Sequence, residues 1–218
     1  MAPMTVEIWS DVVCPWCYVG KRRFEHALER FAHRDQVELT WRSFQLDPSA
    51  PPERTNSSAE HLAAKYGMSV EQAEQSNTQM TELAAGEGLE YHLDRTRGGN
   101  SFNAHRLIHL AARHGVQDAM KERLMRAYFT EGQPLGDKEI LVRLAMEAGL
   151  EAAEARTALE GEAFADTVHA DEELAARIGI RGVPYFVLDR RYGVSGAQPS
   201  ELLLQALEKA WEARADAA

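Results

Sequence analysis

The feature that most restricts how this chain can fold is a pair of cysteines between an apolar segment and an amphipathic one. Cys14 and Cys17 are the two cysteines among 218 residues. The apolar run over residues 6–13 predicts a buried strand that continues into the cysteine turn. Beyond the pair, apolar residues recur at helical spacing, at Phe24, Ala27, Leu28 and Phe31. We therefore expect a helix over residues 15–32, with the cysteines at its N-terminus.

The position of Cys14 favours redox chemistry. A cysteine at a helix N-terminus faces unpaired backbone N–H groups and the positive end of the helix dipole, which stabilise a thiolate. Cys17 follows one turn later on the same helix face. The two Cα atoms are expected about 5 Å apart, which is within the range of a disulfide. Cys14 is thus predicted to be the attacking thiolate and Cys17 the resolving thiol.

Other roles for the cysteine pair are less consistent with the sequence. Structural zinc needs four ligands, and a single pair of cysteines supplies two. A permanent structural disulfide would close a loop of about four residues and would restrict the unfolded chain very little. Two inert buried cysteines are a further alternative, but a Cys-x-x-Cys pair at the start of a helix is more typical of a redox site.

The segments that follow the first helix divide into one strand and a long helical block. Residues 37–42 alternate between apolar and polar, which predicts a half-buried strand. Strand, helix and strand form a βαβ unit, with the cysteines at the carboxyl end of its first strand, the edge where α/β sheets build their sites. Residues 57–161 show helical periodicity, with helix starts predicted at Ser69, at Asn100-Ser101 and at Asp137.

Strand patterns return near the C-terminus. After a helix over residues 163–178, the segments 184–188 and 192–195 flank a short polar turn and predict a hairpin. The last helix begins near Pro199, and its apolar stripe consists of Leu202, Leu203, Ala206, Leu207, Ala210 and Trp211. The order predicts an α/β protein whose main domain is split into residues 1–48 and 162–218 by a helical insertion over residues 49–161.

The charge of the chain limits its partners. The sequence holds 24 Lys and Arg against 34 Asp and Glu, a formal net charge of −10. This balance argues against binding to nucleic acid or to an anionic membrane surface. The N-terminal residues have neither the basic region nor the apolar stretch of a signal peptide, so we expect a cytoplasmic protein. In a reducing cytosol a Cys-x-x-Cys pair is more often catalytic than permanently oxidised.

Four segments carry a family resemblance. They are Asp11-Val12-Val13-Cys14-Pro15-Trp16-Cys17-Tyr18-Val19-Gly20, Asn100-Ser101-Phe102-Asn103-Ala104-His105-Arg106-Leu107, Gly182-Val183-Pro184-Tyr185-Phe186-Val187 and Val194-Ser195-Gly196-Ala197-Gln198-Pro199. In this order they resemble the thioredoxin superfamily, specifically the DsbA-like branch with an all-helical insertion and its FrnE-like group. The resemblance implies a thioredoxin fold and thiol-disulfide oxidoreductase activity on protein or small-molecule disulfides.

The resemblance also implies roles for individual residues. Cys14 would be the nucleophile and Cys17 the resolving thiol. Pro15 and Trp16 between them would contact substrate. Val183-Pro184 would form a cis-proline loop opposite the cysteines, where the Val183 backbone pairs with an extended substrate. Without the resemblance, Pro184 would simply be the first residue of an edge strand.

Four further residues are candidates for supporting roles. Asn100 and His105 would place the helical insertion against the site, or they could be an N-cap and a packing residue. Gln198 would orient substrate or cap the last helix. The family carries a buried acid six residues before the first cysteine, but that position is Ile8 here. Neighbouring Glu7 is therefore a candidate proton shuttle, or else an exposed strand residue.

Trp16 and the lack of other cofactor motifs refine the expected chemistry. Strong oxidants of the family place a histidine between the cysteines, whereas Trp16 brings no charge, so we expect an intermediate redox poise. No metal is expected, although His105 and His109 share a helix face. No cofactor is expected beyond the redox-active disulfide, with glutathione as a candidate thiol partner and a cellular thiol as reductant.

Two other function classes stay open. Kappa-type glutathione transferases and 2-hydroxychromene-2-carboxylate isomerases share this fold, but they have serine in place of Cys14. They also tend to carry an Asp-Arg pair where this chain has Gln198-Pro199. A chaperone-like binding module with vestigial cysteines is the non-enzymatic alternative.

Overall fold

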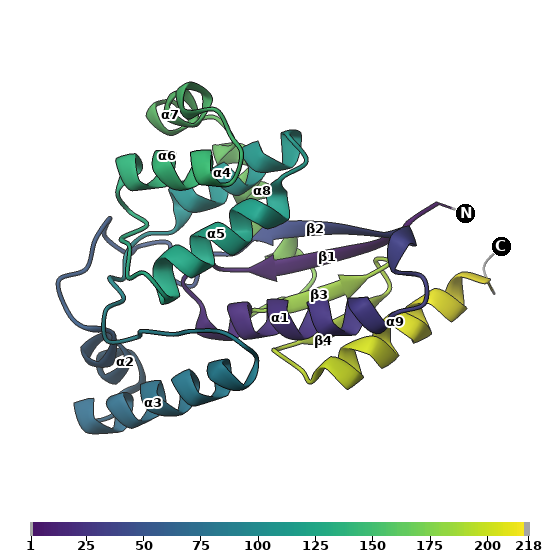
Figure 1. Cartoon of the computed structure of the whole chain (residues 1–218), viewed down its shortest axis with the longest axis horizontal. Helices are drawn as coiled ribbons and strands as arrows, with labels where there is room; N and C mark the ends of the chain where they lie inside the picture. Colours follow the sequence, from purple (N-terminus) through teal and green to yellow (C-terminus); the bar gives the residue numbers. More distant parts are fainter. Residues whose placement is uncertain (1, 216–218) are drawn as a thin grey trace.

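A mixed four-stranded sheet is central to the fold, and the computed structural model describes residues 2–215 of the chain (Figure 1). The strands are β1 (Met4–Ser10), β2 (Val37–Ser43), β3 (Tyr185–Leu188) and β4 (Tyr192–Ser195). Their order is β2-β1-β3-β4. β1 runs parallel to β2, whereas β3 is antiparallel to both β1 and β4. The βαβ unit and the C-terminal hairpin predicted from the sequence are therefore confirmed.

Helices cover both faces of this sheet. On one face lie α1 (Pro15–Arg30) and α9 (Ser200–Ala215), and on the other lies α8 (Ala165–Arg177) (Figure 1). The ring of Phe24 in α1 stacks on Phe186 of β3, with 5.6 Å between the ring centroids. On the opposite face, the Trp9 indole Nε1 donates a hydrogen bond to the Asp171 carbonyl of α8 at 3.0 Å. Side chains of β1 thus alternate between the α1 face and the α8 face.

The described elements between β2 and α8 are all helices, as the sequence predicted. They are α2 (Ser58–Tyr66), α3 (Val70–Gly86), α4 (Phe102–Arg113), α5 (Gln117–Phe129), α6 (Lys138–Glu147) and α7 (Ala152–Glu160), and a short 3-10 turn (Arg34–Gln36) precedes β2. The Ser69 capping box is present, and the Asp137 side chain accepts hydrogen bonds from two backbone N–H groups of α6. The split at residues 48 and 161 stays a prediction.

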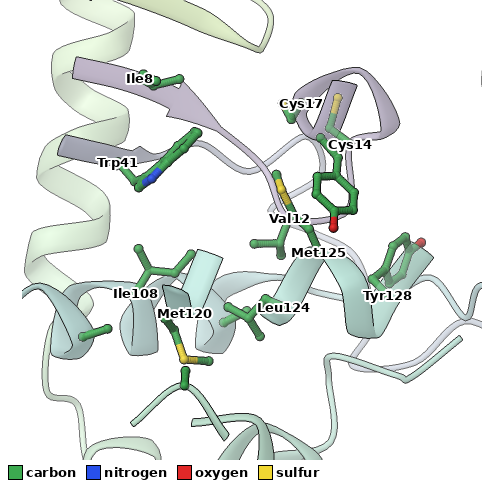
Figure 2. Packing of buried hydrophobic residues seen from close by; sticks show 14 of the residues in the cluster. Ile8, Val12, Cys14, Cys17, Trp41, Ile108, Met120, Leu124, Met125 and Tyr128 are labelled. Carbon is green, nitrogen blue, oxygen red and sulfur yellow. The ribbon is translucent and has the colours of Figure 1, made fainter. Parts of the chain in front are cut away.

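The insertion shares one hydrophobic core with the sheet. Figure 2 shows Met120, Leu124 and Met125 of α5 in the same cluster as Trp41 of β2 and Cys17 of α1. Burial of this apolar surface stabilises the contact between the insertion and the rest of the fold. α5 therefore brings its side chains close to the cysteine helix.

One boundary differs from the prediction. β1 ends at Ser10 and does not continue through Val12 and Val13. The chain turns at Asp11, whose carbonyl accepts a hydrogen bond from the Cys14 N–H at 3.3 Å. The two valines are apolar because the turn packs into the core, with Val12 fully buried, and not because the strand continues.

None of the helices in residues 2–215 combines the length and apolar composition that a membrane crossing requires.

Candidate active site

The two cysteines lie at the start of α1, as predicted. Cys14 is the N-cap residue with extended backbone, and Pro15 occupies the first helical position. Proline suits that position, because its missing N–H would have no partner inside the helix. Cys14 is 5% exposed and Cys17 is 0% exposed. The Cys17 N–H donates to the Cys14 carbonyl at 3.0 Å, so the pair is held within one helical turn.

The loop before β3 lies directly against Cys14. The Sγ atom of Cys14 is 3.7 Å from the Val183 carbonyl oxygen. The Val183-Pro184 peptide bond is cis, and Pro184 is buried. Gly20 of α1 packs against this loop. A Cβ atom built on Gly20 would lie 2.7 Å from Pro184 Cγ, which is too close for a side chain. α1 can therefore approach the loop this closely because residue 20 has no side chain.

A buried carboxylate holds the turn that precedes Cys14. The Asp11 side chain is fully buried and accepts hydrogen bonds from the Leu46 N–H at 2.8 Å and from His105 Nε2 at 3.3 Å. Burial raises the pKa of Asp11, but these hydrogen bonds outweigh it and leave the pKa lowered. Burial also lowers the pKa of His105, so a neutral imidazole donates to the carboxylate. His105 therefore positions the turn from α4.

Asn100 and Gln198 stabilise backbone close to the site. The Asn100 side chain accepts from the Phe102 N–H at 2.8 Å and donates to the Pro48 carbonyl at 3.0 Å. It thus binds the first backbone N–H of α4 from one residue before the N-cap position, and it ties the insertion to the segment after β2. The Gln198 amide donates to the Ser195 carbonyl at 2.8 Å, which closes the turn before α9.

Glu7 lies on the other side of the sheet. It is 5% exposed, so the exposed-strand alternative is wrong. Its carboxylate accepts from Arg42 Nε at 3.0 Å and from Arg190 Nε at 3.2 Å. Arg42 also donates to Asp171 of α8 at 2.9 Å. The carboxylate of Glu7 therefore belongs to the α8 face, whereas the cysteine helix covers the opposite face.

A cavity of about 1000 Å³ opens beside Cys14. Of the predicted site residues, Cys14, Pro15, Trp16 and Val183 line it. The side chain of Trp16 is 44% exposed at this rim. The other walls come from α2, α3 and α5, from the loop after β2, from the loop between α3 and α4 and from the loop before β3. Glu7, Asn100, His105, Pro184 and Gln198 are not among the lining residues.

The metal prediction depends on where the two histidines of α4 point. His105 Nε2 faces Asp11, whereas His109 Nε2 lies 3.1 Å from Asp171 and 2.9 Å from the Ser43 hydroxyl. The two imidazoles thus bind different carboxylates. Within residues 2–215, no group of three or more His, Cys, Asp or Glu side chains is arranged to hold a metal ion.

The environment of Cys17 differs from that of Cys14. Burial raises the pKa of the Cys17 thiol well above its ordinary value, and the adjacent Cys14 raises it further. The ammonium of Lys121 and the hydroxyl of Ser10 act in the opposite direction. Cys17 is therefore a protonated thiol in its resting state, with a cation and a hydroxyl close by.

Comparison with known proteins agrees with this geometry. Residues 5–208 match the family described as the DSBA-like thioredoxin domain. The chain belongs to this family. The DsbA-like fold predicted from the sequence is thereby confirmed, while membership of the FrnE-like group stays a prediction.

Three known proteins are similar to this DsbA-like chain over most of its length. The crystal structure of a probable DsbA oxidoreductase from Streptomyces coelicolor is 50% identical with a TM-score of 0.92, and the match covers 96% of this chain and 90% of the other. The uncharacterised protein YwbO of Bacillus subtilis is 30% identical over 199 residues, which is 84% of this chain and 86% of YwbO. The cytosolic disulfide reductase DsbM of Pseudomonas aeruginosa, in its structure with GSH, is 19% identical with a TM-score of 0.66, over 95% and 99% of the two chains.

Sequence reasoning missed three residues that shape this DsbA-like site. Gly20 admits the proline loop, Tyr91 donates its hydroxyl to the Pro15 carbonyl at 2.8 Å, and Lys121 lies buried near Cys17. A glycine inside a helical pattern is a signal that could have been followed, because it weakens a helix unless close packing requires it. Tyr91 and Lys121 come from the insertion and carry no local pattern that points to the cysteines.

Proposed function

We propose that this chain is a thiol-disulfide oxidoreductase in which Cys14 is the nucleophile and Cys17 the resolving thiol. The observation that carries the assignment is the unequal access of the two sulfurs. Cys14 lines the cavity, whereas Cys17 is 0% exposed and is not among the lining residues. A nucleophile must meet the substrate, but a resolving thiol needs to reach only its partner cysteine.

The proposed reaction reduces a disulfide substrate. The Cys14 thiolate attacks one substrate sulfur, the substrate S–S bond breaks, and one substrate thiolate leaves. Cys17, once deprotonated, attacks the Cys14 sulfur and releases the second substrate thiolate. The protein is oxidised by two electrons to the Cys14–Cys17 disulfide, and the substrate is reduced to two thiols. Reversal of the same steps would oxidise a dithiol.

The cavity supports a small disulfide that carries acidic groups as the substrate class. Its volume of about 1000 Å³ is at the upper end of typical small-molecule sites. The walls are mostly apolar, from residues such as Leu62, Met80 and Phe129. Three cations also line it. Arg54 is paired with Asp47, whereas neither Lys65 nor Arg181 has an ion-pair partner within the described residues. An acidic substrate would supply those partners.

Glutathione disulfide belongs to this class, so glutathione is the proposed thiol partner. The proposed location of the protein is the cytoplasm. A cellular thiol that re-reduces the Cys14–Cys17 disulfide would sustain turnover there. The DsbM structure contains GSH, but at 19% identity that likeness shows the fold alone. The direct support is that Lys65 and Arg181 line the same cavity as Cys14 and have no ion-pair partner within the described residues.

The test compares two aromatic disulfides of similar size, the anionic dithiobis(nitrobenzoate) and the neutral dithiodipyridine. We expect Arg181→Gln to slow reaction of the reduced protein with the anionic compound about three- to tenfold more than with the neutral one. Arg177→Gln is the matched control, since Arg177 is exposed and does not line the cavity. Equal slowing with both compounds would contradict the substrate class.

Cysteine variants test the chemistry itself. Cys14→Ser should abolish reduction of either disulfide, and of insulin in a glutathione buffer. Cys17→Ser should still form one mixed disulfide but should not turn over. Transferase or isomerase chemistry would survive loss of Cys17, and a chaperone-like module would keep its client binding without Cys14. Turnover that survives loss of Cys14 would overturn the proposed function.

A further inference from the structure

Lys121 is a buried cation that the mechanism above leaves without a role. It is 0% exposed on α5 and belongs to the side of that helix that faces the sheet. Its Nζ atom donates to the Ser10 carbonyl at 3.1 Å. The ammonium also lies over the Trp41 ring, 5.3 Å from the ring centroid. Both contacts place it at the end of β1, where the chain enters the cysteine turn.

The lysine lacks the carboxylate partner that a buried ammonium normally requires. Within residues 2–215, no carboxylate lies within 4.0 Å of Lys121 Nζ. Lys21 shows the contrast, because it is 2% exposed but is paired with Glu25, with Asp118 and with Glu122, the last at 2.8 Å. Burial of an unpaired ammonium is costly, and it disfavours the charged form. Burial accordingly lowers the pKa of Lys121 to about 8.

The reactive group on this side of the sheet is Cys17, which belongs to the same buried cluster as Trp41, the residue whose ring Lys121 covers. The Cys17 thiolate is the largest of the influences that oppose the lowering of the Lys121 pKa, and Lys121 in turn lowers the pKa of Cys17. Ser10 connects the two side chains. Its carbonyl accepts from Lys121, and its buried hydroxyl lowers the pKa of Cys17.

The charged groups around Lys121 come from three sides. Cys14, Cys17 and Asp11 of the turn and α1 favour its ammonium form. Lys21 on α1 opposes it, and the neutral His105 of α4 also faces it. Glu7 is not in this set, since its carboxylate binds Arg42 and Arg190 on the α8 face. On the face of the sheet that carries the cysteines, the buried titratable group near Cys17 is therefore Lys121 of the insertion, and not the carboxylate of Glu7.

We propose that Lys121 accepts the proton of Cys17 when the mixed disulfide is resolved, a role that rests on the proposed function. The neutral amine takes the proton, so an S–H bond breaks and an N–H bond forms. The Cys17 thiolate then attacks the Cys14 sulfur, the new S–S bond forms, and the substrate sulfur leaves with the electron pair as a thiolate. The ammonium returns its proton to solvent or to the departing thiolate.

The experiment follows both steps on the full chain with dithiobis(nitrobenzoate). One thionitrobenzoate is released when Cys14 attacks, and a second is released when Cys17 resolves the mixed disulfide. In Lys121→Met we expect the first phase to stay within about twofold of the original protein and the second to slow at least about tenfold near neutral pH. Lys121→Arg, which keeps the charge but has no accessible neutral form, should slow the second phase as well.

Lys209→Met is the matched control. Lys209 also lies over an aromatic ring, Tyr192, at 5.6 Å, but it is exposed on α9. Its loss should change neither phase. Thermal unfolding and near-ultraviolet circular dichroism would establish that each variant is folded.

A measurement on the unaltered protein keeps the proposal testable even if the Lys121 variants do not fold. The rate of the second phase should rise with pH through an inflection near the Lys121 pKa of about 8. A second phase that shows no such inflection would overturn the role of Lys121. So would a folded Lys121→Met protein with an unchanged second phase. If Cys17→Ser still released the second thionitrobenzoate, the proposed function itself would fail.

Discussion

The two faces of the sheet bury charged groups in different ways. On the α8 face, Glu7, Arg42 and Asp171 form a connected set of ion pairs that also includes the Ser43 N–H. On the α1 face, Lys121 contacts the Ser10 carbonyl and has no carboxylate partner within the described residues. Both sets contact the same two strands, yet only the second lies beside a cysteine.

The difference indicates which buried charges serve stability and which serve chemistry. When a buried ion is fully paired, removal of any one partner lowers the stability of the protein. A buried ion without a partner lowers stability, so its presence needs another explanation. The ion pairs of Glu7, Arg42 and Asp171 are therefore a structural network, whereas Lys121 is the buried charge that we propose couples protonation to the sulfurs. Three changes separate the two faces.

The largest effect is expected from Asp171→Ala. This 1% exposed residue accepts from the Ser43 N–H and Arg42 Nη1, both at 2.9 Å, and lies 3.1 Å from His109 Nε2. Its removal leaves the Ser43 N–H buried without a partner and takes one of two partners from Arg42 and from His109. This loss should cost about 3–5 kcal/mol in urea unfolding.

The pH dependence of this effect has a defined sign. Burial raises the pKa of Asp171, but its hydrogen bonds outweigh burial and hold it below 3.8. Its contribution is thus present above that value and is lost as the pH falls through the folded-state pKa. The stability difference between the two proteins should shrink in that acidic range, and the resolution of a mixed disulfide at neutral pH should not change. Slower resolution would contradict the separation of the faces.

An intermediate effect is expected from Lys121→Met, measured as the pH dependence of stability. The Lys121 pKa falls from 10.5 to about 8 on folding, so between these values the unfolded chain binds more protons than the folded one. Stability should therefore rise with pH in that window, by about 2 kcal/mol between pH ~8 and ~9.5. Below this window both states are protonated and the dependence vanishes.

Lys121→Met should abolish this slope. The informative quantity is the difference between the two proteins in the free energy of unfolding, followed by urea titration at each pH. An identical slope in both would mean that Lys121 carries no burial penalty, and the contrast between the faces would be lost.

The smallest effect is expected from Glu7→Gln. It removes the charge that binds Arg42 and Arg190, but the amide keeps hydrogen-bonding capacity, and Arg190 is largely exposed. A loss of about 1 kcal/mol in stability is expected. Both phases of the reaction with dithiobis(nitrobenzoate) should keep their rates and pH profiles. A slower second phase would return the role of proton shuttle to Glu7.

Local patterns were sufficient to predict much of the fold. Some patterns depend only on neighbours in the sequence, so they could be identified without the structure. They are the helical spacing after Cys17, the alternation over residues 37–42 and the capping signals at Ser69 and Asp137. The prediction failed where an apolar segment was buried without being a strand. Val12 is fully buried because the turn at Asp11 packs inward, and no period-2 pattern distinguishes the two cases.

The candidate site was only partly predictable for the same reason. Cys14, Pro15, Trp16 and Val183 belong to motifs, and the structure brings them to one cavity. Lys121 has no such signal. A lysine in an amphipathic helix is normally exposed. Its burial depends on how the insertion packs on β2, which is a long-range contact.

The placement of Val183 beside Cys14 has a consequence for newly synthesised chains. These residues are 169 positions apart, and β3 joins the sheet next to β1. At roughly 5–20 residues per second, the ribosome adds the proline loop roughly 10–30 seconds after the cysteines. During that interval β1 can pair with β2, but Cys14 has no loop against it. The cysteine turn of a nascent chain is thus open on the side that Val183 later covers, and this cover arrives together with the C-terminal hairpin.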